Sequence, residues 1–267
     1  MRCSTAVLQA LMTHPKYNTE EWIIDDYKEM SKRAVKSGAF SYLMALPENY
    51  AKDMLIPEIP RILKTQRKNG MWKVKDAERI SYETLNALKH SEILADLLTD
   101  FKYDPFLSFR DEMDYYGLIV RQNIMEELSQ DDPAFREKLI SDIMVLRKDN
   151  GSWNNTVIST SNNLNMLMDL GLSSDDSRIE QSVNWIFSMC LDDVKRHAKV
   201  LPDEVVGHHM FSNPDRSAEF QSAKEEKPEW NPVGLCYRHL PMIQTGIALK
   251  TLIRLGYEND ERGHLCV

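Results

Sequence analysis

Cysteine and histidine residues near the C-terminus have a spacing that could bind a metal. Cys236 and His239 are separated by two residues, and His264 and Cys266 follow. Thiolate sulfur and imidazole nitrogen are ligands that zinc prefers, and four of them complete its tetrahedral shell. Cys236 and His239 are therefore our candidate metal ligands. The alternative is a partly buried thiol beside a surface histidine.

Acidic residues offer two further candidate sites. Asp25, Asp26 and Glu29 lie on one expected helix, where Asp25 and Glu29 share a face and could hold magnesium together with substrate phosphates. We expect this helix to lie on the outside, where such residues ordinarily form a solvated surface. Asp111 and Asp114 could serve as the paired carboxylates of a glycan hydrolase if both faced a cavity.

Two other acidic pairs stand at the starts of expected helices. Asp131 and Asp132 precede Pro133, a residue that suits the first helical turn, and Asp175 and Asp176 precede another helix. A carboxylate there accepts hydrogen bonds from free N–H groups, so helix capping is the expected role. The sequence has no phosphate loop, nucleophile elbow or dinucleotide fingerprint. We expect no tightly bound cofactor, and zinc and magnesium are the two ions for which candidate ligands exist.

The composition favours a globular protein of one domain. The 267 residues are 42% hydrophobic and 28% charged, and the net charge of −8 is spread along the chain. A duplex-binding surface needs a positive balance, so we expect no nucleic acid partner. No apolar run is long enough to span a membrane, no secretion signal is visible, and the four cysteines are scattered. We expect a cytoplasmic protein with reduced thiols and one domain over residues 1–267.

Helical periodicity dominates the sequence, and no stretch alternates at period two for long enough to need a sheet. The fold class is therefore expected to be all-α. Pro57 and Pro60 must break or kink one helix. Gly171 and Gly256 follow two others, at the position where a left-handed residue usually closes a helix. The pattern dissolves at about 192–231, which we interpret as an irregular insertion. The clearest expected helices span residues 49–66, 79–99, 115–129, 133–147, 159–170 and 242–255.

A short turn before a helix recurs along the chain. The first copy is Gln66-Arg-Lys-Asn-Gly70-Met-Trp72, the second contains Gly151 and Trp153, and a worn third copy ends at Trp230. Glycine permits the tight reversal, and the indole covers the end of the adjoining helix. We interpret these residues as structural braces and not as ligand contacts. Helical pairs that recur in this way bury their apolar stripes by stacking, as in a solenoid or a ring.

The pattern Gln66-x-x-x-Gly70-x-Trp72 resembles the second half of the repeated glutamine-tryptophan motif of squalene and hopene cyclases. In the second copy Arg147 stands where the glutamine should be. Residues 244–256, QTGIALKTLIRLG, are similar to an inner-helix segment of the same superfamily, and residues 3–15, CSTAVLQALMTHP, resemble another. The resemblance covers most of the chain except about 192–230.

The resemblance implies an α/α toroid, in which inner and outer helices surround a central cavity, as in terpenoid cyclases and the β subunits of protein prenyltransferases. An isoprenoid or another apolar ligand would be bound or transformed in this cavity. The inner-helix residues expected to line it are Tyr42, Tyr82, Tyr116, Asn163 and Cys236.

The motifs that carry this superfamily's chemistry are absent from the sequence. There is no Asp-x-Asp-Asp acid to protonate an alkene, and Gly234 stands where an Asp-x-Cys zinc site would need its aspartate. Whether the chain is an enzyme is therefore left open. Two alternatives remain: a noncatalytic helical-repeat module that binds a protein or peptide, and a glycan-active α/α barrel.

Overall fold

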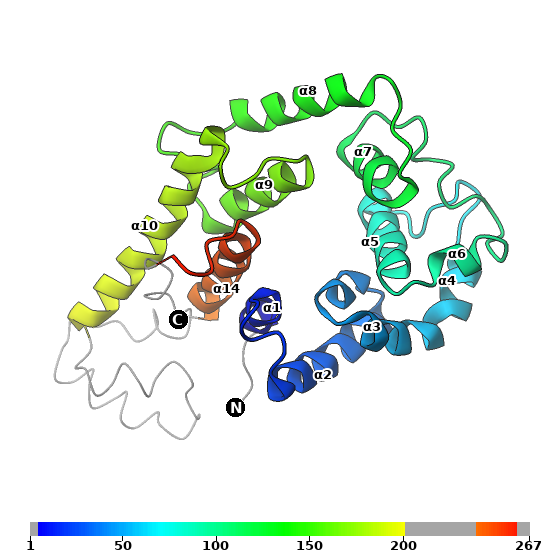
Figure 1. Ribbon diagram of the computed structural model, residues 1–267, viewed down its shortest axis with the longest axis horizontal. Helices are drawn as coiled ribbons and strands as arrows, with labels where there is room; N and C mark the ends of the chain where they lie inside the picture. The colour runs from blue at the N-terminus through cyan, green and yellow to red at the C-terminus, as the bar shows by residue number, and fades with distance from the viewer. Residues whose placement is uncertain (1–4, 201–238, 261–267) are drawn as a thin grey trace. The chain divides into compact units, whose positions relative to one another are not determined.

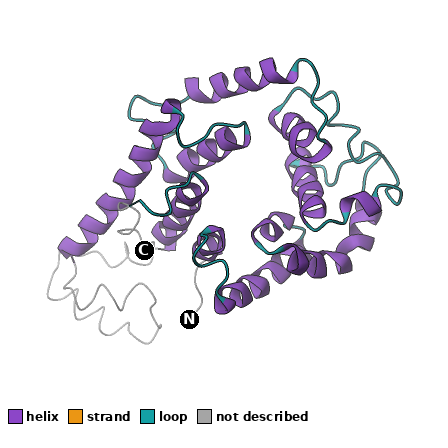
Figure 2. Ribbon diagram, viewed as in Figure 1, coloured by secondary structure: helices purple, strands orange, loops and turns teal. Residues whose placement is uncertain are grey.

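The computed structural model describes residues 5–200 and 239–260, and every regular element in these residues is helical (Figures 1 and 2). The all-α prediction is confirmed. None of the described helices combines the length and the apolar character of a membrane span. The α-helices are α1 (Thr5–Thr13), α2 (Glu21–Ser37), α3 (Glu48–Leu55), α4 (Ile59–Thr65), α5 (Ala77–His90), α6 (Leu94–Leu97), α7 (Tyr115–Val120), α8 (Asp132–Val145), α9 (Val157–Asp169), α10 (Ser177–Val200) and α14 (His239–Arg254). Two 3-10 helices, η1 (Phe40–Ala45) and η2 (Ile56–Glu58), and a π-helix, η3 (Arg121–Met125), lie between them.

The chain divides into two compact units. Unit 1 consists of Met1–His14, Arg147–Met168 and Leu172–Val267, and unit 2 consists of Pro15–Leu146 and Asp169–Gly171. The union of these units in one domain stays a prediction, and so does the arrangement of their helices as an α/α toroid.

Unit 1 brings the first and the last described helices together. α1 and α14 pack so closely that a Cβ atom on Gly246 would lie 2.5 Å from the backbone carbonyl carbon of Ala6. Both helices bury apolar side chains, among them Met12 from α1 and Ala248 and Leu252 from α14. Glycine is needed at position 246 because any side chain would push the two helices apart.

α9 and α10 complete the described part of unit 1. Asn165 of α9 donates to the Thr251 hydroxyl at 2.9 Å and accepts from the Arg254 guanidinium at 2.7 Å, which ties α9 to α14. Phe187 of α10 packs edge-on against Tyr257, with ring centroids 5.8 Å apart. Side-chain hydrogen bonds thus hold α9 to α14, and aromatic packing holds α10 to the residues that follow α14.

α10 is longer than the sequence pattern indicated. It continues to Val200, past the point at about residue 192 where we expected an irregular insertion. The sequence explains the difference, because Pro202 is the first helix breaker after the start of α10. The rest of the expected insertion, 201–231, lies outside the described residues.

In unit 2, the helix expected over residues 49–66 is interrupted at its prolines, as predicted. α3 ends at Leu55, η2 carries Pro57, and α4 has Pro60 in its first turn. The hydroxyl of the buried Tyr27 in α2 donates to the carbonyl oxygen of Tyr42 in η1 at 3.0 Å. η1 in turn packs on α5, so these short elements support the helix that carries Tyr82.

A tight turn joins α4 to the segment before α5. Gly70 has a φ of +83°, and a Cβ atom there would lie 2.1 Å from the carbonyl oxygen of Asp104, so the turn requires glycine. The Gln66 amide donates to the carbonyl oxygens of Gly70 at 3.2 Å and Tyr103 at 2.9 Å. It also accepts from the Tyr103 N–H at 3.1 Å. Gln66 thereby joins the turn to a segment more than thirty residues along the chain.

Trp72 closes this turn and is 4% exposed. Its indole N–H donates to the carbonyl oxygen of Ile62 in α4 at 2.8 Å, and its backbone N–H donates to the Ser81 hydroxyl in α5 at 2.9 Å. The indole packs edge-on against Phe101, with ring centroids 5.8 Å apart. Trp72 therefore contacts both the helix before the turn and the helix after it, which are the contacts of a structural brace.

The second copy of the turn, in unit 1, has the same local geometry. Gly151 has a φ of +89°, and a Cβ atom there would lie 2.6 Å from the Gln181 carbonyl oxygen. Trp153 is 2% exposed, and its backbone N–H donates to the Thr160 hydroxyl in α9 at 3.1 Å. Arg147, in the place of the glutamine, also reaches a distant backbone carbonyl, that of Arg178, at 2.5 Å. The repeat is thus visible in the structure as well as in the sequence.

Three helices of the repeat end in the same way. Each is closed by a residue of positive φ, followed by an N–H that donates five residues back, as in a Schellman motif. The three left-handed residues are Glu92 after α5, Gly171 after α9 and Gly256 after α14, with φ values of 55°, 98° and 82°. The corresponding bonds are Ile93 to Leu88, Leu172 to Leu167 and Tyr257 to Leu252, at 3.0, 3.0 and 2.9 Å.

Candidate functional site

Two of the residues expected to line a cavity meet on neighbouring helices of unit 2. Tyr82 of α5 and Tyr116 of α7 have ring centroids 5.9 Å apart, and Tyr115 lies edge-on against Tyr116 at 5.1 Å. We call Tyr82, Tyr115 and Tyr116 the tyrosine cluster. All three residues are partly exposed. Tyrosine supplies a large apolar face and a polar tip with little conformational entropy to lose, so such a cluster is suited to ligand contact.

A helix cap sets the position of the two tyrosines on α7. The Asp114 carboxylate accepts a hydrogen bond from the Gly117 N–H at 2.6 Å, so α7 begins at Tyr115. Both tyrosines consequently lie in the first turn of the helix. This contact gives Asp114 a capping role, and Asp111 is exposed. Neither position supports the prediction that the two carboxylates act as a glycan-cleaving pair.

Tyr115 is held in the protonated state by its surroundings. Its hydroxyl donates to the Asp169 carboxylate at 2.7 Å, and both residues belong to unit 2. Burial raises the pKa of Tyr115 far above its usual value, and the negative charge of Asp169 raises it further. In the same cluster, Asn86 donates to the Tyr82 hydroxyl at 3.4 Å. Tyr115 therefore acts as a fixed donor that orients one side of the cluster.

Charged residues of α5 flank the tyrosine cluster. Arg79 donates to Glu83 at 2.6 Å and lies 3.6 Å from Asp76, so two carboxylates share this guanidinium. Burial raises the pKa of Tyr116, and the nearby Arg79 opposes that rise. The hydroxyl of Tyr116 is accordingly close to a charge pair and remains protonated at neutral pH.

A second group of carboxylates belongs to Glu112 and Asp114, which precede α7, and to Glu78 of α5. Burial raises the pKa of Glu112, and the neighbouring charges of Asp114 and Glu78 raise it further. Glu78 precedes Tyr82 by one helical turn on α5, and Asp114 directly precedes Tyr115 and Tyr116. The N-terminal turns of α5 and α7 therefore present both aromatic and acidic side chains.

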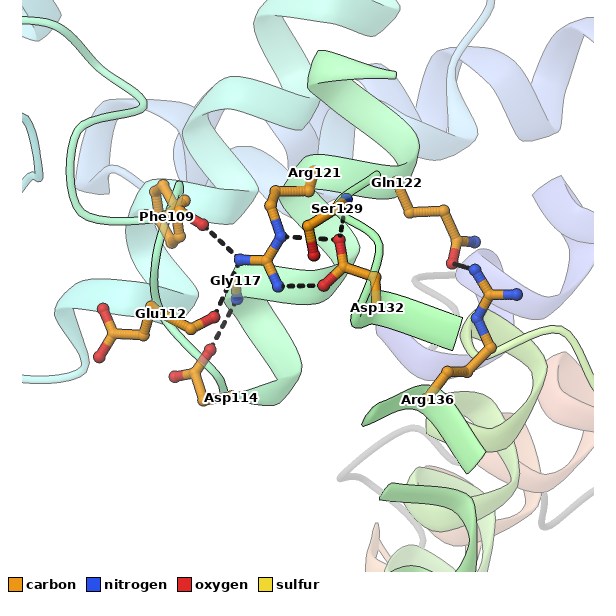
Figure 3. Close-up of polar contacts among 9 residues, drawn as sticks. All are labelled: Phe109, Glu112, Asp114, Gly117, Arg121, Gln122, Ser129, Asp132 and Arg136. Atoms are coloured by element: carbon orange, nitrogen blue, oxygen red, sulfur yellow. Dashed lines mark hydrogen bonds and ion pairs between the residues drawn. The ribbon is translucent and has the colours of Figure 1, made fainter. Parts of the chain in front are cut away.

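A buried ion pair joins α8 to the π-helix η3 (Figure 3). Arg121 donates to both oxygens of Asp132, at 3.0 and 2.6 Å, and the two side chains are 4% and 0% exposed. Arg121 also donates to the carbonyl oxygens of Phe109 at 2.6 Å and Glu112 at 2.9 Å. The pair thus fixes the segment that leads into Tyr115 and Tyr116.

Gly117 allows this segment to approach α7. A Cβ atom at this position would lie 2.3 Å from the Glu112 carbonyl oxygen and 3.2 Å from the guanidinium of Arg121. Any other residue would therefore displace the carbonyl that Arg121 binds. Gly117 and Arg121 together set where the acidic residues stand relative to the tyrosines.

Sequence reasoning did not find the partnership of Arg121 and Asp132. It gave Asp132 a capping role, whereas the carboxylate lies in the core and accepts from Arg121 and from the Ser129 N–H at 2.8 Å. The bonds from Arg121 hold the pKa of Asp132 below its usual value. Because the partners are separated by a loop of irregular structure, no helical spacing connects them. An arginine directly after the apolar residues of α7 is the one signal that the sequence offers.

The expected helix over 115–129 changes its winding at Arg121 and ends at Met125. Residues 121–125 form the π-helix, and Glu126 then has a φ of +58°. Lys89 of α5 donates to the carbonyl oxygen of Asn123 at 2.8 Å and pairs with Glu126. Side chains from α5 and α8 thus hold both ends of this strained turn, and π-turns in helices often accompany functional sites.

Two other expected lining residues occupy different surroundings. Tyr42 is partly exposed in η1 of unit 2, where its carbonyl accepts from Tyr27. Asn163 is also partly exposed but belongs to unit 1, and its amide donates to the Ser159 carbonyl within α9 at 2.8 Å. The structure therefore brings together Tyr82 and Tyr116 from the expected set, and it adds Tyr115.

The candidate metal ligands have no described site. Cys236 lies outside the described residues, and His239 begins α14 without a described side chain. Among the side chains that the structure describes, no group of three or more histidine, cysteine or acidic residues gathers that could hold a metal ion. Asp25 and Glu29 are exposed on α2 and pair with Lys28 at 3.4 Å and Lys32 at 2.5 Å, the contacts of a solvated helix surface.

Comparison of the whole chain with protein-family models, with curated proteins and with solved structures gives no match.

Proposed function

We propose that the chain binds an isoprenoid or another apolar small molecule through the tyrosine cluster, and that its helices form an α/α toroid around that ligand. The observation that carries the proposal is the contact between Tyr82 and Tyr116, two partly exposed aromatic side chains on neighbouring helices. Binding sites for apolar molecules combine such aromatic surface with a few oriented polar groups. Tyr115, held by Asp169, supplies an oriented hydroxyl of this kind.

Binding without chemistry is the form of this function that we favour. The sequence contains neither the Asp-x-Asp-Asp acid nor the Asp-x-Cys pair that the resembled enzymes use. The buried carboxylate of Asp132 is fully engaged by Arg121, so it serves the packing of α8 and not an exposed reaction centre. We therefore expect a carrier or sensor of an apolar molecule.

A titration tests this function. A 15-carbon isoprenoid alcohol is added to the full chain, and binding is followed by calorimetry. We expect saturable binding that weakens at least about tenfold when Tyr82 and Tyr116 are both replaced by alanine, because each ring contributes on the order of 1 kcal/mol of contact energy. Tyr17→Ala, a partly exposed tyrosine outside the cluster, is the control. Equal affinity of the double variant and the control would refute the site.

A noncatalytic module that binds a protein or peptide is the second candidate. Val145 and Leu146, at the end of α8, are 79% and 72% exposed, which is unusual for two adjacent large aliphatic residues and favours a partner contact. This alternative predicts no saturable isoprenoid binding. It also predicts that replacing both residues by glutamate removes bound partners without changing the melting temperature, whereas unchanged partner binding would refute it.

A further inference from the structure

We propose that unit 2 docks on an anionic lipid bilayer through a basic surface beside the first copy of the turn. Six exposed cations on α2, on α4 and on the segment between α4 and α5 form this basic surface, namely Lys36, Lys64, Arg67, Lys68, Lys73 and Lys75. None of them belongs to the tyrosine cluster, so the inference goes beyond the proposed function and does not depend on it.

The charge of this region is opposite to that of the chain as a whole. Residues 61–75 contain six basic residues and no acidic residue, although the whole chain has a net charge of −8. Residues 30–47 likewise contain Lys32, Arg33 and Lys36 and no acidic residue. A local positive excess of this kind attracts anionic partners even when the protein as a whole is negative.

Contacts between α2, α4 and the turn bring the two basic stretches together. Arg61 of α4 donates to the carbonyl oxygen of Val35 in α2 at 2.8 Å. A Cβ atom added at Gly38 would lie 3.6 Å from Nη1 of Arg61 and 3.6 Å from Nζ of Lys73. Arg67 in turn donates to the Lys73 carbonyl oxygen at 2.9 Å. Cations from both stretches therefore gather at the C-terminal end of α2.

The six cations lack counter-charges. None of them is paired with a carboxylate in the part of the chain that the structure describes. Carboxylates next to these segments are engaged by cations outside the basic surface, in the pairs Glu29 with Lys32, Glu58 with Arg61 and Asp76 with Arg79. An anionic partner would reduce the mutual repulsion of the exposed cations.

Helix ends do not account for this charge. The carbonyl end of a helix such as α2 carries about half an elementary negative charge. Arg61 already donates to one of the carbonyl oxygens at this end. Lys68 and Lys75 belong to the segment between α4 and α5 and not to the end of a helix. The basic surface therefore keeps an excess of positive charge.

Two exposed aliphatic side chains accompany the cations. Val74, which is flanked by two lysines, is 78% exposed. Leu107 is 53% exposed, and the hydroxyl of its neighbour Ser108 donates to the carbonyl oxygen of Asn69 in the turn at 2.7 Å. A bilayer offers phosphates to the cations and an apolar boundary to the aliphatic side chains. The phosphate backbone of a nucleic acid offers the charges alone, so this combination favours a lipid surface.

Vesicle co-sedimentation with the full chain tests the inference. Vesicles of phosphatidylcholine alone are compared with vesicles in which about 30% of the lipid is phosphatidylserine. We expect the chain to bind the anionic vesicles at least about tenfold more tightly than the neutral ones. Raising the salt concentration should remove this preference, because salt screens exposed charges.

A triple variant assigns the binding to the basic surface. Replacing Lys68, Lys73 and Lys75 together by glutamine should weaken binding to anionic vesicles at least about 30-fold, because each lysine near such a surface contributes about fivefold. The matched control should change the binding less than about threefold. It removes the same charge from three exposed lysines outside the basic surface, namely Lys52, Lys138 and Lys148. Circular dichroism should show that both variants fold as the natural chain does.

A second variant tests the apolar contact. Val74→Ser should weaken binding to anionic vesicles about threefold, because it exchanges an apolar side chain for a polar one at the bilayer boundary. Val145→Ser is the control, since Val145 is 79% exposed and lies on α8. This control should leave the binding unchanged.

The outcomes decide between a bilayer and other partners. Equal binding to neutral and anionic vesicles, or equal loss of affinity in the two triple variants, would overturn the inference. Tight binding of a short DNA duplex without binding to vesicles would overturn it in favour of a nucleic acid. Unchanged affinity of Val74→Ser would overturn the choice of a bilayer over a soluble polyanion. None of these results bears on the isoprenoid titration, so the two proposals fail separately.

Discussion

At the scale of single residues, one buried tryptophan and one buried ion pair stabilise the elements that carry the tyrosine cluster. Trp72 contacts α4 and α5 at once, and the backbone N–H of Trp153 donates to the Thr160 hydroxyl of α9 as that of Trp72 does to Ser81 of α5. Arg121 and Asp132 hold the segment that leads into α7. Trp72, Arg121 and Asp132 lie outside the tyrosine cluster, and they act on it by fixing backbone positions.

Trp72→Ala should destabilise the protein by about 3 to 5 kcal/mol, because it removes a buried aromatic side chain and leaves the Ile62 carbonyl without its donor. Chemical denaturation measures the free energy of unfolding. Trp22, which is 56% exposed on α2, provides the matched control, and its replacement by alanine should cost less than about 1 kcal/mol. A melting temperature unchanged by Trp72→Ala would rule out its role as a brace.

Asp132→Ala should also lower the free energy of unfolding by about 3 to 5 kcal/mol, since it leaves Arg121 buried without a counter-charge. Chemical denaturation at neutral pH measures this loss.

The ion pair of Arg121 and Asp132 also predicts that the free energy of unfolding depends on pH. The folded-state pKa of Asp132 lies below the unfolded value of about 3.9, so its contribution is complete above that value and is lost as the pH falls through the folded-state pKa. The free energy of unfolding should therefore decrease below about pH 4 more steeply in the natural protein than in the variant. Parallel pH profiles would contradict this assignment.

At the scale of elements, most helices could be predicted from the sequence. The prediction was wrong where tertiary contacts determine the backbone conformation. The prolines of η2 and α4 and the glycines after α9 and α14 act locally, so they were visible in the sequence. The winding of η3 depends on Asp132 and Lys89, which lie on other helices, and the sequence predicted an ordinary helix there. Tyr82 and Tyr116 were expected in one cavity because of the resemblance, whereas the participation of Asp169 required the structure.

The contact between α1 and α14 gives a prediction at this scale. Gly246→Ala should destabilise unit 1 by about 1 to 3 kcal/mol, because the added methyl group meets the backbone of α1. Gly256→Ala is a suitable comparison, since a Cβ atom added there would meet nothing within 4 Å. This substitution should lower the free energy of unfolding by only about 1 kcal/mol, because alanine is strained in the left-handed backbone conformation. Protection of α1 amides from hydrogen exchange should fall in the first variant alone. Equal loss of protection in both would show that the close approach is unimportant.

At the scale of the whole molecule, the repeat and the site support one account. The turn before α5 and the turn before α9 share glycine conformation, buried tryptophan and a hydroxyl acceptor from the following helix, although they belong to different units. The first and last described helices lie together in unit 1. We propose that the tyrosine cluster of unit 2 is where the chain holds its ligand.

The most direct test of this account is a crystal structure of the full chain with a 15-carbon isoprenoid alcohol. The account predicts continuous ligand density in van der Waals contact, within about 4 Å, with the rings of Tyr82 and Tyr116. It also predicts that the hydroxyl end of the ligand lies toward the Tyr115 hydroxyl. A ligand bound elsewhere, with both rings bare, would contradict the central claim.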